Sequence, residues 1–243
     1  PPRSTLFPYT TLFRSGNMAD HNAHTYFGQE VMKRLPRDLR SHCTADLPAF
    51  HLGLYGPDPL IFSFQTKKTS DKLHKQWRNV SLPALSKALR HGDATQRSFA
   101  AGYLLHLLLD DTVHPPIYRW MEEGASHFRM EVALDLILLE EQRRANSPKV
   151  HTEGKERTAR TAAGFIHPVK ERQYLSGLWR MATLSNRFCG PGQAVSGVLR
   201  QRDKTLAHEL RDRMEAQILP AERELEGLLM PAEEPKLELR KVI

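Results

Sequence analysis

The stretch AAGYLLHLLLDDTVHPPIYRWMEEGASHFRMEVALD, residues 100–135, decides the fold of this chain. Five side chains in it are good zinc ligands, namely His106, Asp110, His114, His127 and Glu131. Because an α-helix has about 3.6 residues per turn, His106 and Asp110 lie one turn apart on one face, and the pair of His127 and Glu131 repeats that spacing. The stretch therefore predicts two helices, each with a His-x-x-x-carboxylate pair.

A short turn is expected between these two helices. His114 comes one helical turn after Asp110 and is followed at once by Pro115 and Pro116. Proline has no backbone N–H and disfavours the helical conformation of the residue before it. We therefore expect the first helix to end here and the chain to turn toward the second helix.

A metal-binding role has to be weighed against a structural one. A single histidine on an apolar helix is usually a core residue whose nitrogens are hydrogen-bonded. Here, however, His106 and Asp110 interrupt a leucine-rich run, 104–109, where an unpaired charge would be costly to bury. A bound cation removes that cost. Nitrogen and carboxylate ligands suit zinc better than magnesium or calcium, and manganese or iron is also possible.

With two upstream motifs added, the sequence resembles the zinc-dependent phospholipase C family. The likeness rests on H-x3-D-x3-H followed by H-x3-E, preceded by the His-x-x-x-Gly helix start at 24–28 and the Gly-Pro-Asp turn at 56–58, and it runs roughly from Ala23 to Asp135. The phospholipase C/D domain of glycosylphosphatidylinositol-specific phospholipase D and the single-strand-specific zinc nucleases of fungi and plants share this layout. The resemblance implies an all-α, multi-helix bundle.

The resemblance also implies how the ligands are divided among zinc ions. One zinc would be held by Asp58, His74, His106 and Asp110. A second would be held by His114, His127 and Glu131. Asp110 would bridge toward a third site, which His24 completes, whereas His74 is placed only by its position downstream of Asp58. The secreted enzymes complete the third site with an amino-terminal Trp, which this chain lacks, and His21 is the candidate substitute.

The implied activity is hydrolysis of a phosphate ester by a water held between two zinc ions, with Asp58 as the candidate catalytic base. The leading hypothesis is a phospholipase C-like phosphodiesterase whose substrate is a phospholipid head group. The alternatives are a zinc-dependent single-strand nuclease and a non-catalytic zinc-binding helical module. The sequence has no His-Glu-x-x-His, no Glu-x-x-His and no His-Asp motif, so other common metal enzymes fit poorly.

Charge and cysteine content bear on partners and location. The formal net charge of +7 favours anionic partners such as phospholipid surfaces or nucleic acids. No apolar run approaches the roughly 20 residues that cross a bilayer, and no export signal follows Met18. Cys43 and Cys189 are far apart, which fits a reducing compartment. We therefore expect a cytoplasmic protein.

The chain is predicted to comprise four segments. Residues 1–17 resemble the translated read-through of a sequencing adapter, so we expect a non-native leader before Met18. Residues 18–146 are expected to form the zinc-binding phospholipase C-like core and residues 147–230 a helical continuation that completes the bundle. Residues 231–243 are expected to be a disordered tail.

Helical periodicity is present nearly everywhere, and no period-two pattern predicts a strand. Helices are expected at 23–35, 73–89 (kinked or restarted at Pro83), 96–113 (capped by Asp93 or Thr95), 117–121, 126–144 (with Ser126 as N-cap), 161–181 and 193–226. Residues 46–64 are expected to form a loop, 147–160 a polar linker, and 199–229 a solvated amphipathic helix.

The other histidines are interpreted as surface or capping residues, namely His42, His51, His91, His151, His167 and His208. Ligating imidazoles usually donate their second N–H to a carboxylate. Asp111 and Asp135 are the candidate carboxylates for that role, and the equal alternative is that both are solvated helix charges.

Overall fold

The computed structural model describes residues 21–62, 65–143, 150, 152–165, 169–188 and 201–230. Every regular element within those residues is a helix, so the prediction of an all-α fold is confirmed. The elements are α2 His21–Arg34, α3 Arg37–Cys43, α4 Leu47–Gly53, the 3₁₀ helix η1 Asp58–Phe62, α5 Lys67–Lys75, α6 Trp77–Val80, α7 Leu82–His91, α8 Ala94–Glu122, α9 His127–Glu141, α10 Lys155–Phe165, α11 Glu171–Phe188 and α13 Gln201–Leu229. No helix among the described residues is long and apolar enough to span a bilayer.

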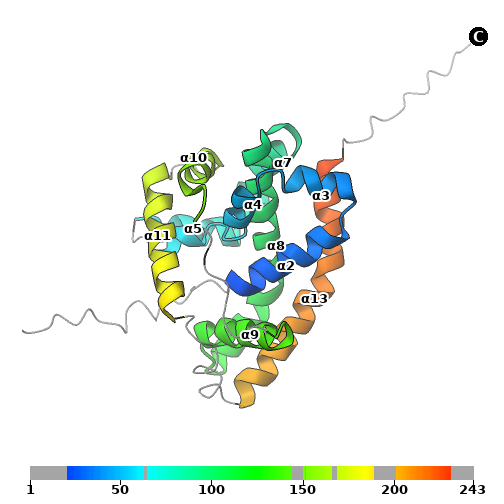
Figure 1. The fold of residues 1–243 in the computed structure, drawn as a ribbon. Helices are drawn as coiled ribbons and strands as arrows, with labels where there is room; N and C mark the ends of the chain where they lie inside the picture. The colour runs from blue at the N-terminus through cyan, green and yellow to red at the C-terminus, as the bar shows by residue number, and fades with distance from the viewer. Residues whose placement is uncertain are drawn as a thin grey trace, which may run out of the picture.

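Helix α8 is the centre of the bundle. It contacts α2, α3, α4, α7, α9, α10 and α13, and in Figure 1 it lies between α11 on one side and α13 on the other. Its first turn has the predicted cap, because the Asp93 carboxylate accepts the Gln96 N–H while the Gln96 side chain accepts the Asp93 N–H. The leucines at 104, 105 and 107–109 are buried, so α8 carries the ligand residues His106 and Asp110 within the core.

The prediction that Pro115 and Pro116 end the first ligand-bearing helix is wrong. Helix α8 continues through both prolines to Glu122, and the segment expected at 117–121 is its last turn. Each of the two interior prolines costs about 3 kcal/mol, and the burial of Ile117 and Trp120 beyond them offsets this by about 1.5–3 kcal/mol each. The turn comes instead at Gly124, whose φ is 85°.

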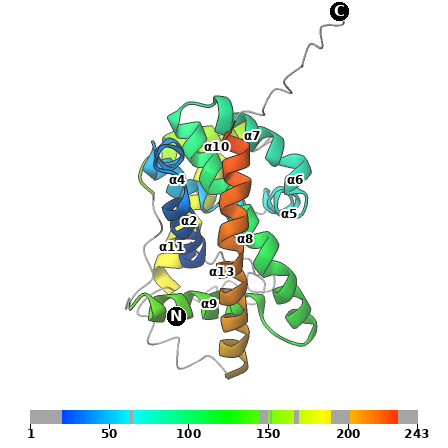
Figure 2. The same ribbon diagram turned by 90° about the vertical axis from the view of Figure 1, so that its right-hand side faces the viewer.

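Helix α9 begins at the predicted place, with Ser126 at the N-cap position, although the Ser126 side chain makes no capping hydrogen bond. It contacts α2, α8 and α13. Figure 2 shows α13 passing in front of both α8 and α9. The bend at 123–126 therefore brings the second ligand-bearing helix back against the same bundle.

The loop predicted for residues 46–64 is instead the short helix α4 followed by η1. Asp46 is the N-cap of α4, and its carboxylate accepts the backbone N–H of Ala49 at 3.3 Å. Phe50 and Leu52 are fully or almost fully buried. The glycines and prolines that suggested a loop therefore lie at the ends of short helices that the core stabilises.

Helices α4 and α8 cross at a pair of glycines. A Cβ atom at Gly53 would lie 2.3 Å from the carbonyl oxygen of Phe99, and one at Gly102 would lie 2.2 Å from that of Phe50. Neither position has room for a larger side chain. This close approach brings the residues that follow α4 beside the ligand positions of α8.

The helix predicted at 73–89 is divided into α5, α6 and α7. The expected restart at Pro83 is confirmed, since α7 begins at Leu82 with this proline in its first turn, but a further break lies at Gln76. The helix predicted at 161–181 is likewise divided into α10 and α11, and α10 begins inside the predicted linker. Residues 1–17, His151, His167, Cys189 and residues 231–243 lie outside the described residues.

Helix α13 packs against α2, α7, α8 and α9. Its buried stripe consists of Ala207, Leu210, Met214, Ile218, Ala221 and Leu225. The expected exposed charge pairing is present, for example between Arg213 Nη2 and Glu209 Oε1 at 2.9 Å. The carboxy-terminal helix is therefore amphipathic, and its apolar face covers the bundle.

Candidate metal centre

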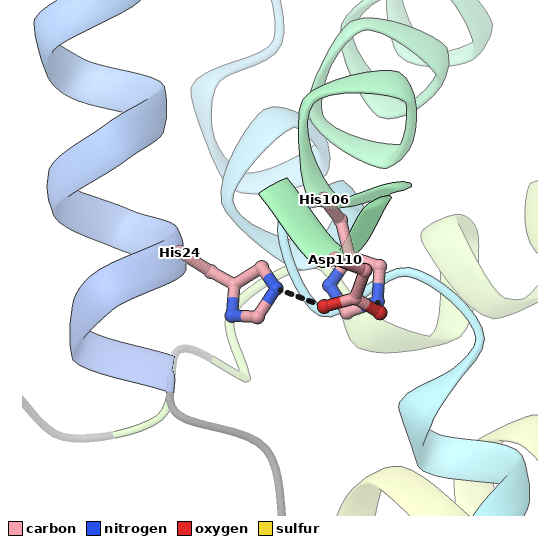
Figure 3. A group of neighbouring side chains, drawn as sticks. All are labelled: His24, His106 and Asp110. Atoms are coloured by element: carbon pink, nitrogen blue, oxygen red, sulfur yellow. Dashed lines mark hydrogen bonds and ion pairs between the residues drawn. The ribbon is translucent and has the colours of Figure 1, made fainter. Parts of the chain in front are cut away.

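Three groups of side chains have ligand atoms within 4.8 Å of one another in the described part of the chain. They are His24, His106 and Asp110; Asp58, His74 and His106; and His114, His127 and Glu131. The eight residues come from α2, η1, α5, α8 and α9. Figure 3 shows the first group, in which His24 reaches from α2 toward Asp110 on α8.

The orientation of His106 depends on the end of α4 and the turn that follows it. Its Nδ1–H donates to the carbonyl oxygen of Leu54 at 3.1 Å. Gly56 lies against the imidazole ring, and a Cβ atom at this position would be 2.3 Å from Cδ2 of His106. Gly56 also has a φ of 48°, which favours glycine. The Gly-Pro-Asp turn therefore both fixes His106 and leads directly to Asp58.

His74 lies on α5 and is held by Ser70, one turn earlier. Its Nδ1–H donates to the Ser70 carbonyl oxygen at 2.8 Å, and the Ser70 hydroxyl donates to the Pro57 carbonyl oxygen at 3.1 Å. The Nε2 atom of His74 lies 3.1 Å from Asp58 Oδ1 and 3.2 Å from Asp110 Oδ2. His74, which the sequence placed only by its position after Asp58, therefore lies close to both carboxylates.

The facing nitrogens of His74 and His106 need a positive charge between them. Both Nδ1 atoms carry protons, because the carbonyl oxygens they face can only accept, so each neutral ring has a lone pair on Nε2. These Nε2 atoms are 3.3 Å apart. Burial lowers the pKa of His106. A proton on His74 or a metal ion would relieve the repulsion.

Asp110 joins the groups together. Its Oδ1 lies 3.1 Å from His24 Nε2 and 3.6 Å from His114 Nε2. Its Oδ2 lies 3.2 Å from His74 Nε2 and 3.3 Å from His106 Nε2. A single buried carboxylate therefore faces four imidazoles from three helices.

The charges of the neighbouring side chains keep both central carboxylates ionised. Burial raises the pKa of Asp58, but the charge of His106 and the hydrogen bond to His74 outweigh it, so this pKa is lowered. Burial also opposes ionisation of Asp110, but the charges of His114 and His106 hold its pKa well below the usual value. Burial lowers the pKa of His74, but Asp58 and Asp110 raise it to about 9.

The third group is formed by one turn of α9 and the middle of α8. His127 Nε2 lies 2.7 Å from Glu131 Oε1, and His114 Nε2 lies 3.6 Å from the same oxygen. The other carboxylate oxygen, Glu131 Oε2, is buried without a hydrogen-bond partner among the described residues. A buried carboxylate oxygen in this state is costly, and a cation would satisfy it.

Three residues that the sequence suggested for the centre lie outside the three ligand groups of the described residues. His21 is buried but does not belong to any of the three groups in the described chain. Asp135 Oδ1 accepts the backbone N–H of Ala23 at the start of α2, and Asp111 lies 3.7 Å from Arg78. Instead, the carbonyl oxygens that orient His106 and His74 belong to Leu54 and Ser70, which no sequence motif indicated.

Tyr118 is a further residue of the centre that sequence reasoning missed. It follows His114 by one turn of α8, and the centroid of its ring lies 5.6 Å from those of both His114 and His127. It is 43% exposed. The i,i+4 spacing from a ligand was a usable signal, but the expected helix break at Pro115 concealed it.

The family described as zinc dependent phospholipase C matches residues 23–175, which is more than half of the chain. The chain belongs to the zinc-dependent phospholipase C family. The resemblance inferred from the ligand spacing is thus confirmed, and the match extends past residue 146 into α11. Searches of curated proteins and of solved structures gave no significant match.

The residues present fit the zinc that this family requires. Histidine nitrogens and carboxylate oxygens are zinc ligands, and in all three groups they come together in numbers that metal sites use. The facing Nε2 atoms of His74 and His106 and the orphaned Glu131 Oε2 are the features of the structure that a cation would explain.

Proposed function

We propose that this protein is a zinc-dependent phosphodiester hydrolase of the phospholipase C type, with a phospholipid head group as substrate. The observation that carries the proposal is the convergence of eight ligand side chains, among them Asp110 and an ionised Asp58. A purely structural zinc site is closed by four ligands, whereas His114, His127 and Glu131 supply only three and would leave a position open for water or substrate.

The proposed ligand sets are the ones that the family resemblance implies. Asp58, His74, His106 and Asp110 would hold one zinc; His114, His127 and Glu131 a second; and His24 with Asp110 a third. Bound zinc supplies Lewis acidity, which lowers the pKa of water and neutralises charge on a phosphate ester. Asp110 would keep the sets together, because both of its oxygens face ligand imidazoles.

Asp58 is the proposed catalytic base. Its Oδ1 faces His74 at 3.1 Å, and we assign to its carboxylate the acceptance of a proton from the attacking water. This role needs the ionised form, and the lowered pKa of Asp58 supplies it at neutral pH.

The surface near the centre bears on the substrate. Tyr118 is 43% exposed, and its ring lies beside those of His114 and His127. An exposed aromatic ring at the edge of a polar centre favours a substrate with an apolar part, such as a phospholipid. The ring of Tyr118 would equally suit stacking on a nucleobase, which is the observation that keeps the single-strand nuclease as the second candidate.

The test combines metal content with activity. We expect at least two zinc ions per chain by elemental analysis, and zinc-dependent hydrolysis of phosphatidylcholine vesicles that exceeds hydrolysis of single-stranded DNA. Protein stripped by a chelator and then reloaded with zinc is the matched control. Faster cleavage of the DNA would favour the nuclease, and zinc-loaded protein without either activity would leave the non-catalytic module.

Zinc removal should also lower the melting temperature. The ligands lie on five elements, so binding energy is coupled to folding. An ion present at about a hundred times its Kd contributes about 2.7 kcal/mol, which corresponds to roughly 5–10 °C for a chain of this size. An unchanged melting curve after chelation would contradict a metal centre in the core. Cytoplasmic location stays a prediction from the sequence.

A further inference from the structure

Helix α11 contacts the segment that carries Asp58, although it has none of the eight ligand residues. It packs on η1, and its Leu178 and Met181 share an apolar cluster with Leu52 of α4 and with Tyr55 of the turn before η1. In Figure 1, α11 (yellow) lies along the edge of the bundle opposite α13. Helix α11 therefore contacts the site although it follows the last ligand residue, Glu131, in the sequence.

Tyr174 forms the first contact. Its side chain is fully buried, and its hydroxyl donates to the carbonyl oxygen of Gly56 at 3.2 Å. Gly56 is two residues before Asp58 and lies against the ring of His106. The phenol of Tyr174 is thus bonded to the very turn that orients both His106 and the proposed base.

Gly177 forms the second contact, one turn further along α11. A Cβ atom at this position would lie only 1.8 Å from the carbonyl oxygen of Pro59, the residue after Asp58. Glycine is unfavourable inside a helix, so its presence here needs a reason, and the backbone of η1 supplies one. Any side chain at this position would push η1 away from α11.

Arg180 forms the third contact. Its Nη1 donates to the carbonyl oxygen of Phe62 at 2.9 Å, at the far end of η1. From the other side, the Ser70 hydroxyl of α5 donates to the carbonyl oxygen of Pro57. The segment from Gly56 to Phe62 is therefore held by α5 and α11 together.

We propose that α11 is the positioning element for Asp58, with Tyr174 and Gly177 as positioning residues that act through the backbone of residues 56–59. This inference rests on the proposed function, because it takes Asp58 as a zinc ligand and catalytic base. Two α11 contacts lie on either side of Asp58 in the sequence, so displacement of either one rotates or shifts its carboxylate relative to His74.

A role in packing alone has a different signature. Loss of packing lowers the melting temperature in proportion to the contact removed, but leaves the geometry around the metal unchanged. Loss of positioning alters the ligand geometry and the turnover rate while substrate affinity changes little. The visible absorption of Co(II) bound in place of zinc reports the ligand geometry directly, without any need for turnover.

The experiment compares Tyr174→Phe and Gly177→Ala with matched controls. Tyr26→Phe also removes one tyrosine hydroxyl that donates a hydrogen bond, here to Glu215 on α13. Gly227→Ala also adds a methyl group inside a helix, at a position with nothing within 4 Å. Each protein is loaded with Co(II) for spectra and with zinc for kcat, KM and melting temperature.

We expect both α11 variants to change the Co(II) spectrum and to lower kcat by about 10- to 100-fold, as changes next to ligands do, with KM altered less than about twofold. The two controls should match the wild type in both measurements. If Gly177→Ala fails to fold, Tyr174→Phe decides, because it keeps the buried ring.

A lower melting temperature with an unchanged spectrum and unchanged kcat would overturn the proposal and leave α11 a packing element. If the wild type hydrolyses no phosphodiester, the proposed function fails, yet the Co(II) spectra still decide whether α11 positions Asp58. The two failures are therefore distinguishable.

Discussion

The two ends of the metal centre are assembled in different ways. The group of His114, His127 and Glu131 comes from α8 and α9, which follow each other directly in the chain. The group of Asp58, His74 and His106 draws instead on η1, α5 and α8. The first arrangement needs only one bend between two helices, whereas the second needs three separate segments to meet.

This difference shows where the centre is sensitive to the rest of the fold. The group of Asp58, His74 and His106, here called the Asp58 side, depends on the close crossing of α4 and α8 and on contacts from α5 and α11. The group of His114, His127 and Glu131, here called the Glu131 side, depends mainly on the turn around Gly124. Asp110 faces both sides, so substitutions there and at each side separately can test how independent the two sides are.

The largest effect is expected for Asp110→Asn. The substitution keeps the shape but removes the charge that faces four imidazoles, so both sides should lose zinc and hydrolysis should fall by more than about a hundredfold. Zinc content and turnover measure this. The matched control is Asp111→Asn at the next, exposed position, which should keep both. Full zinc and activity in Asp110→Asn would refute its central role.

Asp58→Asn should separate chemistry from metal binding. A general base contributes about 10²- to 10⁴-fold, so turnover should fall within that range while the Glu131 side keeps its zinc. The corresponding change on the other side, Glu131→Gln, should remove zinc from that side first. Equal zinc losses from both sides in Asp58→Asn would show that the two sides fill as one unit.

The sequence predicted the ligands of α8 and α9 because helical spacing alone places them on one face. It placed His74 only by order in the chain, since its approach to Asp58 depends on how α5 packs. It predicted a helix end at Pro115 because the burial of Ile117 and Trp120 beyond the prolines is a tertiary effect. The contact of Tyr174 with Gly56 spans 118 residues and has no local signal.

The same reasoning accounts for the loop expected at 46–64. Glycine and proline usually mark turns, and here they do so at the ends of α4 and η1. The sequence does not show why residue 53 has to be a glycine, which is that the backbone of α8 leaves no room for a side chain there. The glycines and prolines therefore marked the turns correctly, whereas helix α4 is stabilised by burial of its side chains in the core.

The pH dependence of zinc affinity should be a moderate effect. The pKa of His74 is raised to about 9, so without metal this imidazole is protonated at neutral pH, and zinc has to displace its proton. Affinity on the Asp58 side should therefore rise about tenfold per pH unit between about pH 7 and 9 and then level off. Chelator competition at several pH values measures this, and a constant affinity would contradict a protonated His74.

The smallest effect is expected for His24→Ala. His24 contacts Asp110 Oδ1 at 3.1 Å and belongs to a single ligand group, so the variant should lose the third metal while the other two sites stay largely filled, and turnover should fall by less than about tenfold. Its ring also stacks on His106, with centroids 4.2 Å apart, so truncation leaves a space beside a ligand of another zinc. His24→Gln refills part of that space and is the matched control. If both variants lose all their zinc equally, the third group is not separable from the other two, and the centre assembles as a single cooperative unit around Asp110.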